Sequence, residues 1–386
     1  MAVARRRDLV TTMPQARREH RNDLRIVVDH QDARALLLAH APRYAARLVE
    51  VNRPPRFAHT PTETASWGCR MSRWIWIAII LVIGAAAVVM LGDVRQLTAR
   101  LGGFHWAALA AALCLALANY AIRFVRWGLY LRRQAIAVPL GTSALVFGAG
   151  LSLSITPGKV GELVKSYLLR ELCRVPVTRS APIVVAERVT DLIALLLLAI
   201  AGVAAYGIAA SVALAAAALI AAGLVLLAWP LPTRALIDLA TRPRRLARFR
   251  APLHDMYAGL AALCRPATLA SAVALAVPAW ACECVGFALI VNAFPGEHVD
   301  LGLAMVIYAA TTIAGALSFL PGGLGVTDGA MAMWLARGAA QVDPSSAVDA
   351  TLLTRLATLW FAVAIGLACL AAARRRARAR ASAPAG

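Results

Sequence analysis

Residues 154–170 read SITPGKVGELVKSYLLR and interrupt an apolar run that is long enough to be crossing a membrane. Pro157 and Gly158 break the run, and a charged helix with Lys159, Glu162 and Lys165 is expected to begin at once. Hydrocarbon contains no water to satisfy the backbone groups that such a break releases. Broken membrane helices are therefore tolerated only where protein or a wet cavity surrounds them. We expect this stretch to lie inside the protein, beside a polar groove.

A second stretch, LSFLPGGLGVTDG at residues 317–329, repeats the pattern. Leu153, Ser154, Pro157, Gly158 and Gly161 recur at identical spacing as Leu317, Ser318, Pro321, Gly322 and Gly325. Paired Gly/Pro-interrupted apolar segments are the best sequence sign of a membrane transporter's binding site. The alternative is two ordinary helix-ending turns at the membrane surface. The predicted helix-break residues are Pro157, Gly158, Gly161, Pro321, Gly322, Gly323 and Gly325.

The composition places the chain among helical membrane proteins. Of 386 residues 60% are hydrophobic, and the mean hydropathy is +0.68, which is too apolar for an ordinary soluble domain. The 40 Lys and Arg against 20 Asp and Glu give a net charge of +20, which could reflect nucleic acid, anionic lipid or membrane topology. Most bases are arginines between apolar runs, so we assign the charge to topology first and to lipid headgroups second, and expect no nucleic-acid partner.

Apolar run lengths predict an all-α polytopic protein with about six full spans and two interrupted units. The predicted spans are Trp74–Leu91, Phe104–Ile122, Pro182–Tyr206, Val212–Ala228, Leu269–Phe294 and Leu352–Ala372, and the interrupted units are Pro139–Leu169 and Leu301–Leu335.

The charges between the spans predict the orientation. Segments 122–138, 157–180, 230–267 and 373–386 together hold 21 Lys and Arg, and the segments between them hold few. The positive-inside rule then places both termini in the cytoplasm of a bacterial inner membrane. In this topology the two interrupted units enter from opposite sides, as inverted re-entrant helical hairpins. The arginines of the first segment are assigned to topology rather than to a site, and these are Arg123, Arg126, Arg132 and Arg133.

Three regions follow from these patterns. Residues 1–70 carry 13 Arg against 7 Asp and Glu and have no run of span length, so they read as a disordered basic extension. Because Met71 directly precedes the first span, translation starting there is an alternative hypothesis. Residues 71–375 form the predicted transmembrane domain, and residues 376–386 form a basic cytoplasmic tail.

Several charges fall within apolar runs, where each costs about 2.5–3.5 kcal/mol by insertion scales, so they should pair or face a cavity. Arg188 and Asp191 are three residues apart and should be neighbours on one helix face. Such a pair could lock helix packing, or Arg188 could snorkel to an interface or bind a phosphate. Glu283 has no partner that can be read from the sequence and is a weaker candidate.

The segment after the first break suggests two further roles. A helix start favours an anion, to which Lys159 would add, while Glu162 could answer a headgroup ammonium or carry a proton. Asp328 would supply the acidic group of the second unit. The candidate lipid-headgroup residues are Lys159, Glu162, Glu187, Arg188, Asp191, Asp328 and Arg355.

Several ordered motifs carry a resemblance to a known family. They are NYAIRFVRW (residues 119–127), PGKVGE (157–162), ERVTD (187–191), PGGLG (321–325), and Arg355 ahead of Leu359 and Trp360. Over about residues 71–375 the chain resembles the flippase-like membrane family named for the transmembrane region of lysylphosphatidylglycerol synthases.

The resemblance implies a membrane unit that moves a modified phospholipid, or another polar-headed lipid, between leaflets. The membrane lipid would be anionic, aminoacylated or otherwise polar-headed, and relatives also occur beside hopanoid and lipid-linked sugar pathways. The bifunctional synthases add a soluble C-terminal aminoacyl-transferase domain. We expect that half to be absent here, because the sequence ends about a dozen residues after its last predicted span. Asp328 stands where Glu is more usual in the family.

Motifs for catalysis are missing from the sequence. There is no Gly-rich loop ending in Gly-Lys-Ser/Thr for ATP, no dinucleotide fingerprint, no zinc-type spacing and no nucleophile elbow. We therefore expect no enzyme activity, catalytic residue, metal or cofactor, and a passive or ion-driven process. A small-solute secondary transporter, a lipid-carrier transferase and a non-transporting accessory subunit remain alternatives. The sequence does not predict the oligomeric state.

Overall fold

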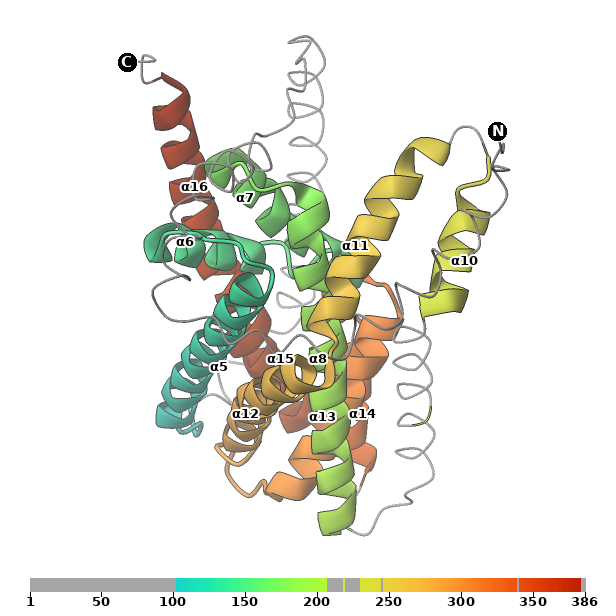
Figure 1. The fold of residues 1–386 in the computed structure, drawn as a ribbon. Coiled ribbons are helices and arrows are strands. Elements are labelled where there is room, and N and C mark those ends of the chain that lie inside the picture. Colours follow the sequence, from blue (N-terminus) through green and yellow to red (C-terminus); the bar gives the residue numbers. More distant parts are fainter. Residues whose placement is uncertain (1–101, 207–217, 219–229, 244–245, 339, 383–386) are drawn as a thin grey trace, which may run out of the picture. The chain divides into compact units, whose positions relative to one another are not determined.

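The computed structural model describes residues 102–206, 218, 230–243, 246–338 and 340–382 (Figure 1). These residues belong to one compact unit of the chain, Leu81–Gly386. All regular elements in the described part are helices, so the predicted all-α class is confirmed. The predicted extension 1–70 and the span Trp74–Leu91 lie outside the described residues, as does the span Val212–Ala228 apart from residue 218.

Three helical segments in the described part are long and apolar enough to cross a membrane. They are α5 (Trp106–Arg133), α12 (Pro266–Val291) and the segment Pro344–Ala379. The last segment joins α15 (Pro344–Arg355), a π-helical turn η4 (Leu356–Trp360) and α16 (Phe361–Ser382). The 30-residue helix α8 (Val177–Tyr206) starts before the predicted span at Pro182. The total of six spans and their orientation stay predictions.

Both interrupted units are broken at the predicted residues. The first unit consists of α6 (Leu140–Leu151), the 3-10 turn η1 (Pro157–Leu163) and α7 (Val164–Cys173). The second consists of α13 (Leu301–Leu317), η3 (Pro321–Gly323) and α14 (Val326–Arg337). The charged α-helix after the first break therefore begins at Val164, after the seven-residue 3-10 segment, and not directly after Gly158 as the sequence predicted.

The two breaks contact each other. Turn η1 packs against η3, and a Cβ on Gly322 would lie 3.0 Å from Cγ1 of Ile155. Gly322 has φ +61°, Gly323 +68° and Gly325 +82°, a region that side-chain-bearing residues rarely adopt. The second break thus needs glycine both for its backbone path and for its approach to the first.

The long helices pack in pairs that are distant in sequence. Helix α5 lies along α12, α8 along α13, and α6 along α16. A larger apolar core joins α5, α8, α12 and α13 around Trp280 and Phe287, and a second core surrounds Trp127, Phe147 and Leu169. The interrupted units are therefore held between full-length helices.

Residues 230–263, predicted as part of an inside loop, are mostly helical. Helix α10 (Pro230–Ala240) packs against α11 (Arg250–Leu263), and α11 packs on α8. Asp238 Oδ1 lies 2.7 Å from Arg250 Nε and 2.8 Å from His254 Nε2. These two hydrogen bonds lower the pKa of Asp238 to about 2, so the carboxylate stays charged at neutral pH.

The crossing of α16 over the first break allows a test of packing. A Cβ on Gly366 would lie 2.1 Å from the backbone N of Ser152 and 2.6 Å from its Cα, and backbone atoms cannot rotate away. Gly366→Ala should lower the free energy of unfolding by about 1–3 kcal/mol. Gly128→Ala is the control, because a Cβ there meets nothing within 4 Å and alanine favours a helix. Melting temperatures in detergent measure both, and equal values would contradict the close crossing.

Candidate functional site

Helix α8 supplies the acidic centre of the site. Asp191 follows Arg188 by three residues and Glu187 by four, so it neighbours both along the helix surface. Arg188 Nη2 lies 3.0 Å from Asp191 Oδ2, which confirms that these two are neighbours. Glu187 and Asp191 are buried, and the Arg188 side chain is 25% exposed. The ion pair of Arg188 and Asp191 therefore extends from the protein interior toward an accessible surface.

Helix α5 brings two arginines to Asp191. Arg126 is fully buried, and its guanidinium donates to Asp191 Oδ1 at 2.7 Å and to Thr190 Oγ1 at 3.0 Å. Arg123 is also buried, with Nη2 at 3.9 Å from Asp191 Oδ2. The assignment of these two arginines to a cytoplasmic topology signal was wrong, because α5 continues past Ile122 to Arg133 and carries both into the protein.

The segment after the first break completes the charged group. Glu162 Oε2 lies 3.1 Å from Arg188 Nη2 and 3.3 Å from Lys165 Nζ, and Lys165 also pairs with Glu187. The Lys165 ammonium lies over the rings of Trp127 and Phe147, at 5.1 and 5.7 Å from their centroids. We call the following seven residues the charge cluster: Arg123, Arg126, Glu162, Lys165, Glu187, Arg188 and Asp191.

The second unit has its own ion pair. Asp328 Oδ1 lies 2.7 Å from Arg355 Nε, and Asp328 Oδ2 accepts a hydrogen bond from the backbone N of Gly325 at 3.1 Å. Arg355 also donates to the carbonyl oxygen of Gly322. In this arrangement Asp328 and Arg355 hold the second break in place. The side chain of Lys159, the remaining candidate, lies outside the described residues.

A cavity of about 310 Å³ lies between the two breaks. Both breaks contribute to its wall, Ser154 and Thr156 from the first and Gly322 and Gly323 from the second. Its charged lining residues are Arg123, Arg188, Asp191, Glu283 and Arg355. Three predicted site residues, Arg188, Asp191 and Arg355, thus face one cavity. Glu162, Glu187 and Asp328 are not in the lining but pair with cations of the site.

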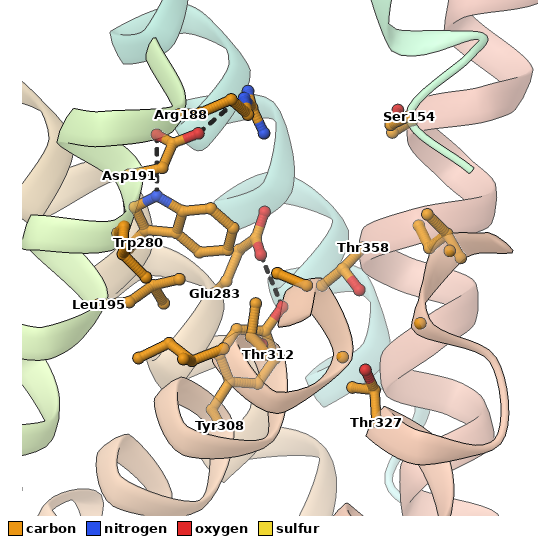
Figure 2. Close-up of a pocket in the computed structure, with 18 of the residues that line it drawn as sticks. Ser154, Arg188, Asp191, Leu195, Trp280, Glu283, Tyr308, Thr312, Thr327 and Thr358 are labelled. Atoms are coloured by element: carbon orange, nitrogen blue, oxygen red, sulfur yellow. Dashed lines mark hydrogen bonds and ion pairs between the residues drawn. The ribbon is translucent and has the colours of Figure 1, made fainter. Parts of the chain in front are cut away.

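Aromatic groups of α12 and α13 orient the acids of the cavity (Figure 2). Trp280 Nε1 donates to Asp191 Oδ1 at 3.1 Å, and the Tyr308 hydroxyl donates to Glu283 at 2.6 Å. Trp280 and Tyr308 were not predicted, since aromatic residues are common in membrane helices and carry no charge signal. The charge of Glu283 inside an apolar run was the available signal, and its partner comes from a different helix.

The cavity reaches the surface past an apolar rim at the second break. Leu317, Phe319 and Leu320 line the cavity and are 62%, 70% and 43% exposed, and we call them the apolar lip. Phe319 has φ +52°, a strained conformation for a non-glycine residue that persists only where its surroundings impose it. The cavity is thus charged inside and apolar at its edge.

The cavity lining carries groups of both signs. It holds three guanidinium groups and two carboxylates, and Glu162 and Asp328 behind the lining pair with Arg188 and Arg355. Across the part of the chain that the structure describes, no three His, Cys, Asp or Glu side chains group to hold a metal ion.

Comparisons with known proteins agree with the fold. The model of a family described as the lysylphosphatidylglycerol synthase TM region matches residues 75–366. A protein described as a UPF0104 membrane protein, from Methanothermobacter thermautotrophicus, is 25% identical over 326 residues, which cover 76% of this chain and 94% of that relative. The resemblance drawn from the sequence motifs is confirmed. The chain is a multi-pass membrane protein that belongs to the family of the lysylphosphatidylglycerol synthase TM region.

Proposed function

We propose that this protein moves a polar-headed phospholipid between the two leaflets of a membrane. The headgroup passes through the cavity between the breaks, and the acyl chains stay in the bilayer outside. The observation that carries the proposal is the pairing of a charged interior with the apolar lip. An amphipathic substrate needs both surfaces at once, whereas a water-soluble solute has no use for an exposed apolar rim.

The size of the cavity supports passage of a headgroup alone. Pockets for small ligands span about 300–1,000 Å³, so about 310 Å³ is at the small end of that range. A lipid with two acyl chains does not fit inside it. The exposed side chains of Leu317 and Phe319 are suited to contact acyl chains at the cavity edge.

The charged residues have distinct roles in this mechanism. Arginines of the lining hold the headgroup phosphate, as a guanidinium offers parallel N–H donors to phosphate oxygens. Asp191 and Glu283 answer a cationic part of the headgroup or carry a proton. The process is passive or driven by an ion gradient, and the protein is not an enzyme in this proposal. The chain lies in a bacterial inner membrane with both termini in the cytoplasm, on the strength of its loop charges.

A leaflet-sidedness assay tests the function directly. Purified protein in vesicles should speed the transfer of a fluorescent phosphatidylglycerol from the inner to the outer leaflet, measured by chemical bleaching of the outer leaflet. Protein-free vesicles are the control. Uptake of a water-soluble solute without lipid transfer would contradict the proposal. Product formation from an activated donor would indicate a transferase, and no flux at all would indicate an accessory subunit.

The apolar lip predicts a loss of lipid transfer when it is made polar. Phe319→Asn should slow transfer about tenfold, because an amide does not replace the apolar contact with an acyl chain. Leu117→Asn is the matched control, since Leu117 is 48% exposed but lies outside the cavity lining. Equal rates for the two variants would remove the lip from the mechanism.

Arg188 is expected to contribute to transfer through its contacts with two acids. Arg188→Ala removes the ion pairs to Glu162 and Asp191 and should slow transfer about tenfold or more. Arg188→Lys keeps the charge without the planar fork and should give an intermediate rate. The same lipid assay measures both, with melting temperatures as a check on folding. A rate for Arg188→Ala equal to that of the parent would exclude this residue from the mechanism.

A further inference from the structure

The three arginines that line the cavity differ in how closely carboxylates and carbonyl groups contact them. Arg188 lies within 3.1 Å of oxygens of both Glu162 and Asp191, and Arg355 is held by Asp328 and by the Gly322 carbonyl. The nearest carboxylate oxygen to Arg123, Oδ2 of Asp191, lies 3.9 Å away. No hydrogen bond joins the Arg123 guanidinium to any residue in the described part of the chain, whereas Arg188 and Arg355 each donate one from Nη2, and the Nε atoms of all three are buried without a hydrogen bond.

The lack of hydrogen-bond acceptors for the Arg123 guanidinium costs free energy at this buried position. The Arg123 side chain is only 9% exposed, and it lies in α5, a helix long and apolar enough to cross a membrane. A buried guanidinium at that depth needs a counter-charge and acceptors for its five N–H donors. Because Arg123 lines the cavity, its N–H groups without an acceptor can reach a ligand bound there.

Four carboxylates act on Arg123, those of Asp191, Glu162, Glu187 and Glu283, but none lies close enough for a hydrogen bond. Asp191 faces three arginines, with Arg126 at 2.7 Å, Arg188 at 3.0 Å and Arg123 at 3.9 Å. Glu162 also serves Arg188, and Glu187 pairs with Lys165. The charge cluster holds four cations and three anions, Glu283 beside it adds a fourth negative charge, and the longest ion pair of Asp191 is the one to Arg123 at the cavity. Glu283, the other acid of the lining, accepts from Tyr308.

We propose that Arg123 is the primary phosphate-binding residue of the cavity, with Arg188 as a second donor at the entrance. A guanidinium can present two parallel N–H groups to a phosphate, which suits the ester phosphate of a lipid headgroup and free phosphate alike. This inference rests on the proposed lipid transfer and names the substrate class as a phospholipid. Arg188 must give up a carboxylate contact to join the phosphate, whereas Arg123 does not.

Binding to the purified full-length protein tests the assignment. The probes are short-chain phosphatidylglycerol, inorganic phosphate, and a diacylglycerol of equal chain length without phosphate, each titrated by calorimetry. Arg123→Gln should weaken phosphatidylglycerol binding about tenfold or more, as charged hydrogen bonds are lost. Arg132→Gln is the control, because Arg132 is exposed near the end of the same helix and outside the lining. Its affinity should equal that of the parent.

Two further measurements keep the assignment open to refutation if Arg123→Gln does not fold. Arg123→Lys should retain part of the affinity, and Glu283→Gln should raise it about threefold or more by removing a competing negative charge. Unchanged affinity in both variants would overturn the role of Arg123. Equal binding of the diacylglycerol would show that phosphate is not recognised, and inorganic phosphate binding as tightly as the lipid would refute a phospholipid site.

The outcome separates this inference from the proposed function. If the parent transfers lipid and Arg123→Gln binds phosphatidylglycerol as tightly as the parent, the assignment of Arg123 is wrong and transfer stands. If the parent binds phosphatidylglycerol through Arg123 but transfers none, the anion site stands and the transport proposal is wrong.

Discussion

The rest of this structure depends on the hydrogen bonds and ion pairs that the buried carboxylate of Asp191 makes with three helices. It is buried on α8, where it accepts from Arg126 of α5 and Trp280 of α12 and pairs with Arg188 of its own helix. Ionised groups at membrane depth are tolerated only when they are matched, and removing one partner of a buried pair leaves a charge that nothing compensates. Three helices are thus held in register by a single acid, and the breaks are positioned around it.

The requirement that buried polar groups find partners also applies to the backbone at the two breaks. Interrupted helices leave polar groups without partners, and the chain satisfies them locally. The hydroxyl of Thr156 accepts from the backbone N of Gly161 at 2.7 Å, and Asp328 accepts from that of Gly325. Packing η1 against η3 then shields both breaks with protein and leaves one cavity between them. The cavity with charged lining residues therefore forms where the two interrupted helices meet.

Much of this arrangement could be read from the sequence, because Pro, Gly and charged residues stand out in apolar runs. The break positions, the neighbours Arg188 and Asp191, and Arg355 were found in this way. Arg126 was missed because its partner Asp191 lies 65 residues away, and an arginine at the end of an apolar run looks like a loop residue. Lys165 was not among the predicted site residues, because its aromatic and acidic surroundings come from other helices. The roles of Arg126 and Lys165 depend on contacts with other helices, which the local sequence pattern does not show.

The distance along the chain between Arg126 and Asp191 has a consequence for biosynthesis. Helix α5 is synthesised first, and 65 more residues must be made before Arg126 can meet its partner Asp191. At about 5–20 residues per second this interval lasts roughly 3–13 seconds. During that time the Arg126 guanidinium lacks this carboxylate, and an unpaired guanidinium in lipid is costly. We therefore expect α5 to move fully into the bilayer only once α8 is available to pair with Arg126.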